Sequence, residues 1–265
     1  MLAKVYGSEI GDEALFVTHT YLAMLSRAIV TMALFPRARH TPKMFRGIVN
    51  GDFFKERNLA NLAETDFFAW ALDTSAEQTL LENIRGILTC LGVYDFDKLD
   101  GDILKELYEA LVDPESRHTL GQHYTPDWLA ELILDKINYT GGRLLDPACG
   151  SGTFLYAAVR RLRRMGKVSK RKLVKTITED IIGIDIHPFA VLMAKANLLL
   201  SLKEEVAAYP HGKLGTELGI LTFSFADLRQ SFAGGHLGLS SNFYEDVVAV
   251  CDHPVNAQMC LTAQT

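Results

Sequence analysis

The sequence predicts an α/β fold, with a doubly wound parallel sheet preceded by a helical region. Three observations lead to this prediction. Residues 1–115 show apolar residues at helical spacing, whereas from residue 116 onward short apolar runs alternate with helical patterns. A turn with two glycines follows the first of those apolar runs. Strands that alternate with helices form parallel βαβ units, and a ligand of such a sheet binds at the carboxyl ends of its strands.

Composition narrows the class of protein. The chain has 265 residues and a net charge of -5, so any contact with nucleic acid must be local or made by other parts. Its four cysteines, Cys90, Cys149, Cys251 and Cys260, form no C-x-x-C pair, which favours free thiols in a reducing, cytoplasmic setting. Cys251, His253 and Cys260 are too few and too scattered to indicate a metal site, and we expect no metal.

The amino-terminal segment does not resemble a signal peptide, because Glu9, Asp12 and Glu13 lie where such a peptide needs positive charge and an apolar run. The apolar stretch at residues 21–35 is interrupted by Arg27 and is too short to span a bilayer. We interpret it as a buried or amphipathic helix and expect no membrane association.

The region 1–115 is predicted to be a helical domain. Helical spacing is shared by apolar residues in three stretches, namely Leu22, Leu25, Ile29 and Met32; Leu80, Ile84, Ile87 and Leu91; and Leu104, Leu107, Tyr108 and Leu111. Between the first two, residues 47–68 hold an Asn50-Gly51 turn signal and no strand alternation. This region contains no catalytic constellation, and we interpret it as a scaffold.

The region 116–265 is predicted to be a second domain in which helices and strands alternate. The expected elements are a helix at 127–137, a strand at 143–146, a helix at 153–165, a strand at 181–186, a helix at 188–202, and strands at 220–225 and 246–250. The first helix should begin with Thr125 as its cap and Pro126 at its first position.

The main motif is DPACGSGTF at residues 146–154. The first strand ends at Asp146, glycines allow the backbone to turn sharply and approach a ligand, and a helix begins with its free N–H groups directed at the turn. A dinucleotide-binding fingerprint would need a third glycine at position 155, where this chain has Leu155. The motif therefore argues against NAD or FAD.

Two acidic residues follow later strands. Asp185 ends the second strand, where a carboxylate can accept both hydroxyls of a ribose. The alternative is a solvated side chain that caps the helix beginning at Pro188, and the order of strand, glycine turn and acid favours the ribose. Asp227 ends the third strand and either accepts from an adenine amino group or is a turn residue. His187 is interpreted as a loop residue beside the adenine.

The segment HTLGQHYTP at residues 118–126, followed by a helix and the DPACGSG motif, resembles the amino-methylating DNA methyltransferases. The similarity extends over about residues 101–228 and is greatest to the adenine-N6 enzymes of type I and type IIG restriction–modification systems. It implies a class I S-adenosylmethionine (SAM) methyltransferase fold, which is Rossmann-like, and SAM as the cofactor.

The resemblance also implies roles for individual residues. At the methionine end of SAM it places Tyr124, Thr125 and Pro126 in contact, with Asp146 near the ammonium group. It places Ala148, Gly150 and Gly152 in the turn under the cofactor. At the other end it places Asp185 on the ribose, with Ile186 and Asp227 flanking the adenine.

One part of the chain departs from the family pattern. These enzymes carry Asn/Asp-Pro-Pro-aromatic after the fourth strand, so that a flipped adenine stacks on the aromatic ring while oxygen atoms accept its amine hydrogens. Here residues 252–255 are DHPV, so Asp252 and Pro254 match the motif while His253 and Val255 do not. No further strands are expected after Val255, which predicts a sheet incomplete on its C-terminal side and a truncated or degraded catalytic motif.

A basic run lies near the middle of the chain. It consists of Arg160, Arg161, Arg163, Arg164, Lys167, Lys170, Arg171, Lys172 and Lys175. Such a run can contact phosphates, but it sits at the far end of the helix that leaves the glycine turn, where cations are favoured by the helix dipole. We favour a solvated face.

The sequence is compatible with three functions. The first is a SAM-dependent DNA adenine-N6 methyltransferase of a restriction–modification system, an enzyme by family whose activity in this chain alone is not expected. The second is a catalytically silent SAM-binding module. The third is another amino-methyltransferase, such as a protein-glutamine N5 enzyme, against which residues 122–126 argue. The expected partners are DNA, through other parts or a partner subunit; a specificity or restriction subunit; and a second copy, through the open edge of the sheet.

Overall fold

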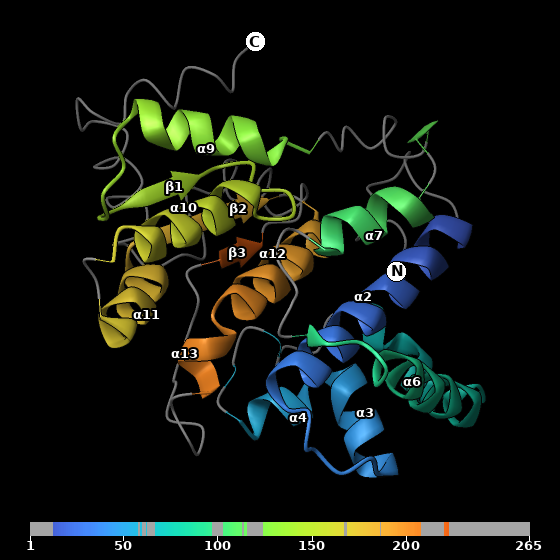
Figure 1. Cartoon of the computed structure of the whole chain (residues 1–265). Coiled ribbons are helices and arrows are strands. Elements are labelled where there is room, and N and C mark those ends of the chain that lie inside the picture. The colour runs from blue at the N-terminus through green and yellow to red at the C-terminus, as the bar shows by residue number, and fades with distance from the viewer. Residues whose placement is uncertain are drawn as a thin grey trace, which may run out of the picture.

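The computed structural model shows helices packed on a small parallel sheet (Figure 1). The residues that it describes are 13–57, 59, 62, 67–96, 103–112, 114–115, 124–166, 169–185, 187–207 and 220–222. The expected strand at 246–250 lies outside these residues, and so do Ile186, Asp227, Asp252 and Pro254. The three cysteine and histidine residues considered above as metal ligands, Cys251, His253 and Cys260, also lie outside them.

The amino-terminal part is helical, as predicted. Its elements are α2 (Glu13–Leu34), α3 (Pro42–Asn50), α4 (Asp52–Lys55), the 3-10 helix η1 (Phe67–Asp73), α6 (Glu77–Leu91) and α7 (Ile103–Leu111). The helices α3 and α4 were not predicted. Thr41 caps α3 by accepting from the Met44 N–H at 3.1 Å, and Gly51 ends it with a positive φ of 88°. The Asn50-Gly51 turn signal therefore separates two helices.

Helix α2 lies at the centre of the helical part. It is longer than the predicted stretch and is buried on several sides, so its polar side chains need partners inside the protein. Thr20 and Ser26 donate to carbonyl groups one turn earlier in the same helix, at 2.8 Å each. Within the described residues, α2 alone is long and apolar enough to cross a membrane by length and composition, and 67% of its apolar window is buried. Core helices of globular proteins meet the same criteria.

The sheet consists of β1 (Leu144–Asp146), β2 (Ile181–Asp185) and β3 (Ile220–Thr222) in the described residues. Its order is β1-β2-β3 and both pairs are parallel. Asp146 pairs with Gly183, and Asp185 pairs with Thr222, so the carboxyl ends of all three strands lie at one edge. This confirms the predicted parallel βαβ arrangement over these strands.

Helices cover the sheet and one another (Figure 1). They are α9 (Asp127–Lys136), α10 (Thr153–Arg164), α11 (Lys170–Glu179), α12 (Pro188–Ser201) and α13 (Lys203–Ala207). Helix α10 packs between α9 and α12, and α10, α11 and α12 also contact β2. Helix α11 was not predicted, because its sequence had been interpreted only as part of the basic run. The cap of α9 is Pro126, without a side-chain hydrogen bond, so the prediction of a Thr125 cap is wrong.

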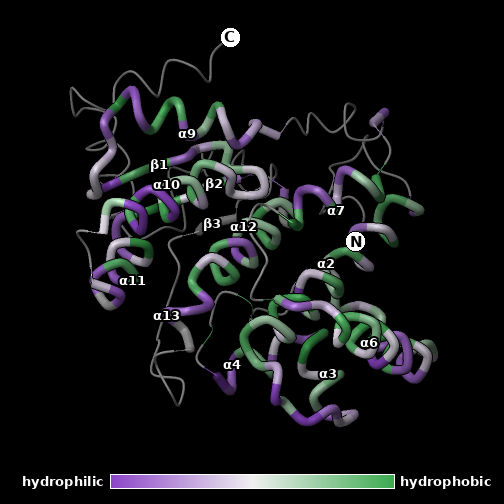
Figure 2. Tube along the Cα trace, viewed as in Figure 1, coloured by the Kyte–Doolittle hydropathy of each residue, from purple (hydrophilic) through white to green (hydrophobic). Residues whose placement is uncertain are grey.

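Helix α12 joins the two parts of the molecule. It contacts β2 and β3 and also packs along α2, which explains why all of residues 189–199 are buried. One continuous apolar core therefore extends from the helical part to the sheet. In Figure 2, hydrophilic residues gather instead on outer elements such as α11 and the far part of α6. The division at residue 115 stays a prediction.

Candidate cofactor site

The carboxyl ends of β1 and β2 are joined through the glycine turn. The Gly150 N–H donates to Asp185 Oδ2 at 2.9 Å, and the Cys149 N–H donates to the Ile184 carbonyl at 2.9 Å. The other carboxylate oxygen of Asp185 accepts from the His187 N–H at 2.8 Å. The acid that ends the second strand thus fixes the turn after the first strand and the entry to α12.

The two glycines of the turn have different surroundings. Both have positive φ, 52° at Gly150 and 87° at Gly152, a conformation that other residues adopt at a cost. A Cβ at Gly150 would lie 3.4 Å from ring carbons of Tyr124, which is ordinary contact. A Cβ at Gly152 would lie 3.1 Å from Ala194 Cβ and 3.2 Å from its Cα. Gly152 is therefore required for close packing of the turn on α12.

Helix α12 also supports the turn by a hydrogen bond. The Asn197 side chain is buried, and its amide Nδ2 donates to the Ser151 carbonyl at 3.0 Å. A buried amide held in this way fixes the position of the turn, because breaking the bond would leave polar groups unsatisfied. Sequence reasoning missed Asn197, since nothing in its local pattern distinguishes it from a core position of α12.

Asp146 lies buried beside the turn. Its Oδ1 accepts from the Ala148 N–H at 3.2 Å. Burial raises the pKa of Asp146 to about 6, and the nearby negative charge of Asp185 adds to this effect against the opposing hydrogen bond from Ala148. Burial and the same two carboxylates also raise the pKa of the Cys149 thiol, which stays protonated at neutral pH. The strand ends thus hold two carboxylates in a partly desolvated setting that favours a cationic group.

The segment Tyr124-Thr125-Pro126 lies beside the turn, as the resemblance implied. Tyr124 reaches Gly150 with its ring, and helix α7 also contacts the segment. Lys105 of α7 forms an ion pair with Asp127, with Nζ–Oδ1 at 2.7 Å, and its Nζ donates to the Thr125 carbonyl at 3.4 Å. Thr125 therefore contributes a backbone oxygen to this contact with α7.

Five rings connect the helical part to the site, and we call them the aromatic cluster. Its members are His19, Tyr108, Tyr124, His187 and Phe189. The His19 ring stacks on Phe189, with centroids 4.6 Å apart and planes at 10°, and meets the edge of His187 at 5.2 Å. Tyr108 lies 5.7 Å from His19 and makes an edge contact with Tyr124 at 5.6 Å. Sequence reasoning missed His19 entirely and placed Tyr108 only on a helix face.

Burial keeps both histidines of the cluster neutral. It lowers the pKa of His19 to about 3, with a smaller effect from His187, and it lowers the pKa of His187 to about 4. Neither ring can act as a cation near neutral pH. The interpretation of His187 as a loop residue beside the adenine stays a prediction.

The structure brings together most of the residues predicted for the cofactor. Those near the ends of β1 and β2 are Tyr124, Thr125, Pro126, Asp146, Ala148, Gly150, Gly152 and Asp185. Their predicted contacts with SAM stay predictions. The other two, Ile186 and Asp227, lie outside the described residues, and so do the predicted catalytic residues Asp252 and Pro254.

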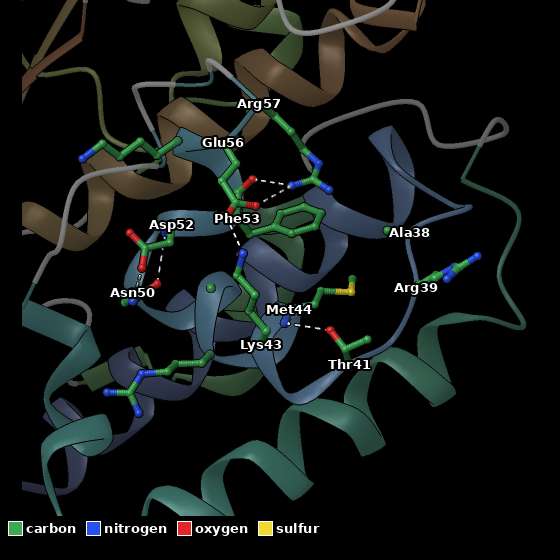
Figure 3. Close-up of a pocket in the computed structure, with 13 residues that line it drawn as sticks. Ala38, Arg39, Thr41, Lys43, Met44, Asn50, Asp52, Phe53, Glu56 and Arg57 are labelled. Atoms are coloured by element: carbon green, nitrogen blue, oxygen red, sulfur yellow. Dashed lines mark hydrogen bonds and ion pairs between the residues drawn. The ribbon is translucent and has the colours of Figure 1, made fainter.

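A separate hollow on α3 and α4 shares no residue with this site (Figure 3). Five cations line it, and three of them have partners within the protein. Lys43 pairs with Glu56, with Nζ–Oε1 at 2.9 Å, and Arg46 pairs with Glu77. The Arg57 guanidinium lies 3.6 Å from the centroid of the Phe53 ring. This arrangement does not favour the hollow over the strand ends as the ligand site.

Part of the basic run is also paired within the protein. Acidic residues from other elements contact it, through Arg160–Glu131, Arg161–Asp135, Arg163–Glu205 and Lys170–Glu204. These contacts join α10 to α9 and α13, and α11 to α13. The run was predicted to be a solvated face, and these ion pairs show that it also joins neighbouring helices.

Comparisons with known proteins show what this chain is similar to. Residues 99–209 match the family model for N-6 DNA Methylase. The chain is 33% identical over 114 residues to the adenine-specific methyltransferase PglX of Streptomyces coelicolor, a match to 38% of this chain and 9% of that protein. It is 39% identical over 80 residues to the type I restriction enzyme MjaIX methylase subunit of Methanocaldococcus jannaschii, which covers 30% and 13%. It is 29% identical over 173 residues to DNA methyltransferase A of Bacillus subtilis, which covers 51% and 20%.

These matches span only 9% to 20% of the three relatives, so the activity of a whole relative does not transfer directly. The segment that matches the family model, residues 99–209, holds α7, the Tyr124 segment, the glycine turn and Asp185. Over residues 99–209, the chain is therefore similar to the N-6 DNA methylase family.

Proposed function

We propose that this chain carries the SAM-binding part of a DNA adenine-N6 methyltransferase with a class I, Rossmann-like sheet. The observation that carries the proposal is the bond between the Asp185 carboxylate and the Gly150 N–H, at the shared end of two parallel strands. It joins the second-strand acid to the glycine turn within the family segment. Ligands of open parallel sheets bind at this edge.

The residues at the strand ends fit SAM. The cofactor carries an ammonium group, a sulfonium and a ribose with two hydroxyls, and the site offers two carboxylates whose mutual repulsion a cationic ligand would relieve. Asp185 would accept from the ribose hydroxyls, and Asp146 would pair with the ammonium. Gly150 and the Tyr124 ring would contact the methionine part.

SAM supplies an electrophilic methyl group when it is bound. The described residues would orient that group: the turn fixes the backbone, Asp185 fixes the ribose, and Tyr124 limits the space beside Gly150. Transfer to adenine also needs oxygen acceptors for the amine hydrogens and a surface on which the flipped base stacks. Asp252 and Pro254 are the candidates for that part of the site.

The proposed partners are DNA and a specificity or restriction subunit of a restriction–modification system, because one kind of relative is named as the methylase subunit of a type I restriction enzyme. The second candidate function is a SAM-binding module without transferase activity. The DHPV sequence favours it, because Val255 stands where the family has its aromatic residue. Tritiated methyl transfer to adenine-rich DNA, measured with and without a candidate subunit, separates the two, and we expect no transfer by the chain alone.

Binding calorimetry with SAM tests the proposed site directly. We expect Asp185→Asn to lower the affinity by about tenfold or more, because a charge-assisted pair of hydrogen bonds to the ribose is weakened. The amide keeps one oxygen acceptor for the turn, so the fold should survive, which circular dichroism would check. Asp73→Asn, at an exposed carboxylate at the end of η1, is the matched control and should bind as the wild type does. Equal affinity of wild type and Asp185→Asn would contradict the assignment.

A further inference from the structure

Helix α7 contacts the Tyr124 segment at two points. Lys105 binds the Thr125 carbonyl and the Asp127 carboxylate, and Tyr108 places its ring against the Tyr124 ring. Lys105 and Tyr108 are three residues apart, so they lie on the same side of the helix. The Lys105 side chain is only 12% exposed, and Tyr108 is fully buried. These are the properties of residues that hold a segment in place.

Helix α2 contributes to the same arrangement from far away in the sequence. His19 is fully buried, stacks on Phe189 and lies against Tyr108, whose hydroxyl is 3.3 Å from His19 Nε2. His19 also contacts His187, which follows Asp185 by two residues. One cluster therefore reaches Tyr124 beside the turn and His187 beside the second-strand acid.

We propose that Tyr108 and Lys105 of α7, together with His19 of α2, are positioning residues of the cofactor site. Lys105 and Tyr108 hold Tyr124 against Gly150 of the turn. His19 holds His187, which follows Asp185 by two residues. The helical part of the chain is thereby a component of the site as well as a scaffold. This inference rests on the proposed SAM-binding function, and it adds residues that the motif does not contain.

The simplest alternative is that the cluster only contributes to the stability of the core. Three variants of the full chain distinguish the two roles: Tyr108→Leu removes the ring, Tyr108→Phe removes only the hydroxyl, and Lys105→Met removes the charge. Leu88→Ala is the matched control, because Leu88 is fully buried in α6 and belongs to the same core but not to the aromatic cluster. Each variant is melted first, and SAM binding is then measured by calorimetry well below every melting temperature.

We expect Tyr108→Leu to weaken SAM binding by about fivefold and Lys105→Met by about threefold, because edge contacts between rings and partly buried ion pairs are of this order. Tyr108→Phe should restore affinity to within about twofold of the wild type, since it keeps the ring. Leu88→Ala should lower the melting temperature at least as much as Tyr108→Leu does, without changing the affinity of the folded protein.

The outcomes separate the proposals. If the wild type binds SAM and Tyr108→Leu binds equally well, the positioning role is wrong while the proposed function stands. If Leu88→Ala loses affinity in proportion to its loss of stability, the cluster has only a structural role. If the wild type itself does not bind SAM, the proposed function fails first, and amide hydrogen exchange still tests the cluster. In that measurement, exchange at Tyr124 and Thr125 that is no faster in Tyr108→Leu than in the wild type would overturn the positioning role.

Discussion

The motif-bearing region, residues 124–205, and the helical region, residues 13–112, build the site by different physical means. In the motif-bearing region, the candidate site is formed mainly by backbone geometry and by hydrogen bonds between carboxylates and backbone N–H groups, as at Gly150 and Asp185. In the helical region, the contributions come from side chains that meet across long separations, such as His19 and Tyr108, which are 89 residues apart.

This difference explains what a motif can reveal. Turns with positive φ need glycine whatever surrounds them, so the sequence records them locally. A packed ring needs only a complementary neighbour, and many residue types fill a core position. The motif therefore predicts which end of the sheet would bind a ligand, but it does not reveal the residues of α2 and α7 that we propose as positioning residues of that site.

The largest expected effect contrasts a glycine from each region. Gly152→Ala should destabilise the chain by about 2–3 kcal/mol, because it combines a left-handed conformation with close contacts to Ala194. Gly86→Ala should instead stabilise it by about 0.5–1 kcal/mol, since Gly86 is an exposed interior residue of α6 with open space around it. Urea denaturation measures both changes. If both substitutions changed the free energy of unfolding equally, the two regions would not differ in their need for glycine.

Much of the motif-bearing region could be predicted from sequence. The strand expected at 143–146 is β1 (Leu144–Asp146), and the helix expected at 188–202 is α12 (Pro188–Ser201). Alternation of short apolar runs with helical patterns is a strong signal when each element packs on its sequence neighbours. The juxtaposition of Asp185 and the turn followed from the parallel order of the strands.

The missed features depend on long-range contacts or on competing local signals. Helix α11 has buried residues at Leu173, Val174 and Ile177, a helical spacing that the surrounding basic residues obscured. The predicted cap at Thr125 was wrong because Pro126 occupies the cap position. The Thr125 carbonyl accepts from Lys105, 20 residues earlier, and no local pattern could show this.

The next largest effect concerns the basic run, which belongs to the motif-bearing region but contributes to packing. Arg163→Ala should cost about 1–2 kcal/mol of folding free energy, because it leaves the Glu205 carboxylate, only 2% exposed, without its ion pair. Lys175→Ala removes an exposed pair with Glu179 and should cost at most about 0.5 kcal/mol. Denaturation at low and high salt compares them. If both variants keep full stability and instead weaken DNA binding, the run contacts phosphates.

The smallest expected effect is a pH dependence of stability and of SAM affinity, which arises from Asp146 in the motif-bearing region. Folding raises the pKa of Asp146 to about 6, so the ligand-free chain loses stability as pH rises from about 4 to 6 and this carboxylate ionises in a buried place. A ligand ammonium beside it would favour the ionised form. We therefore expect SAM affinity to increase by about fivefold, or about 1 kcal/mol, from pH 5 to pH 7.

His19 and His187 should not contribute, because burial lowers their pKa values to about 3 and about 4, and both stay neutral over this range. Calorimetry across this range measures the increase, and Asp146→Asn is the control in which it should disappear. A pH profile that is unchanged in Asp146→Asn would place the ammonium away from this strand and would assign the titration to another group.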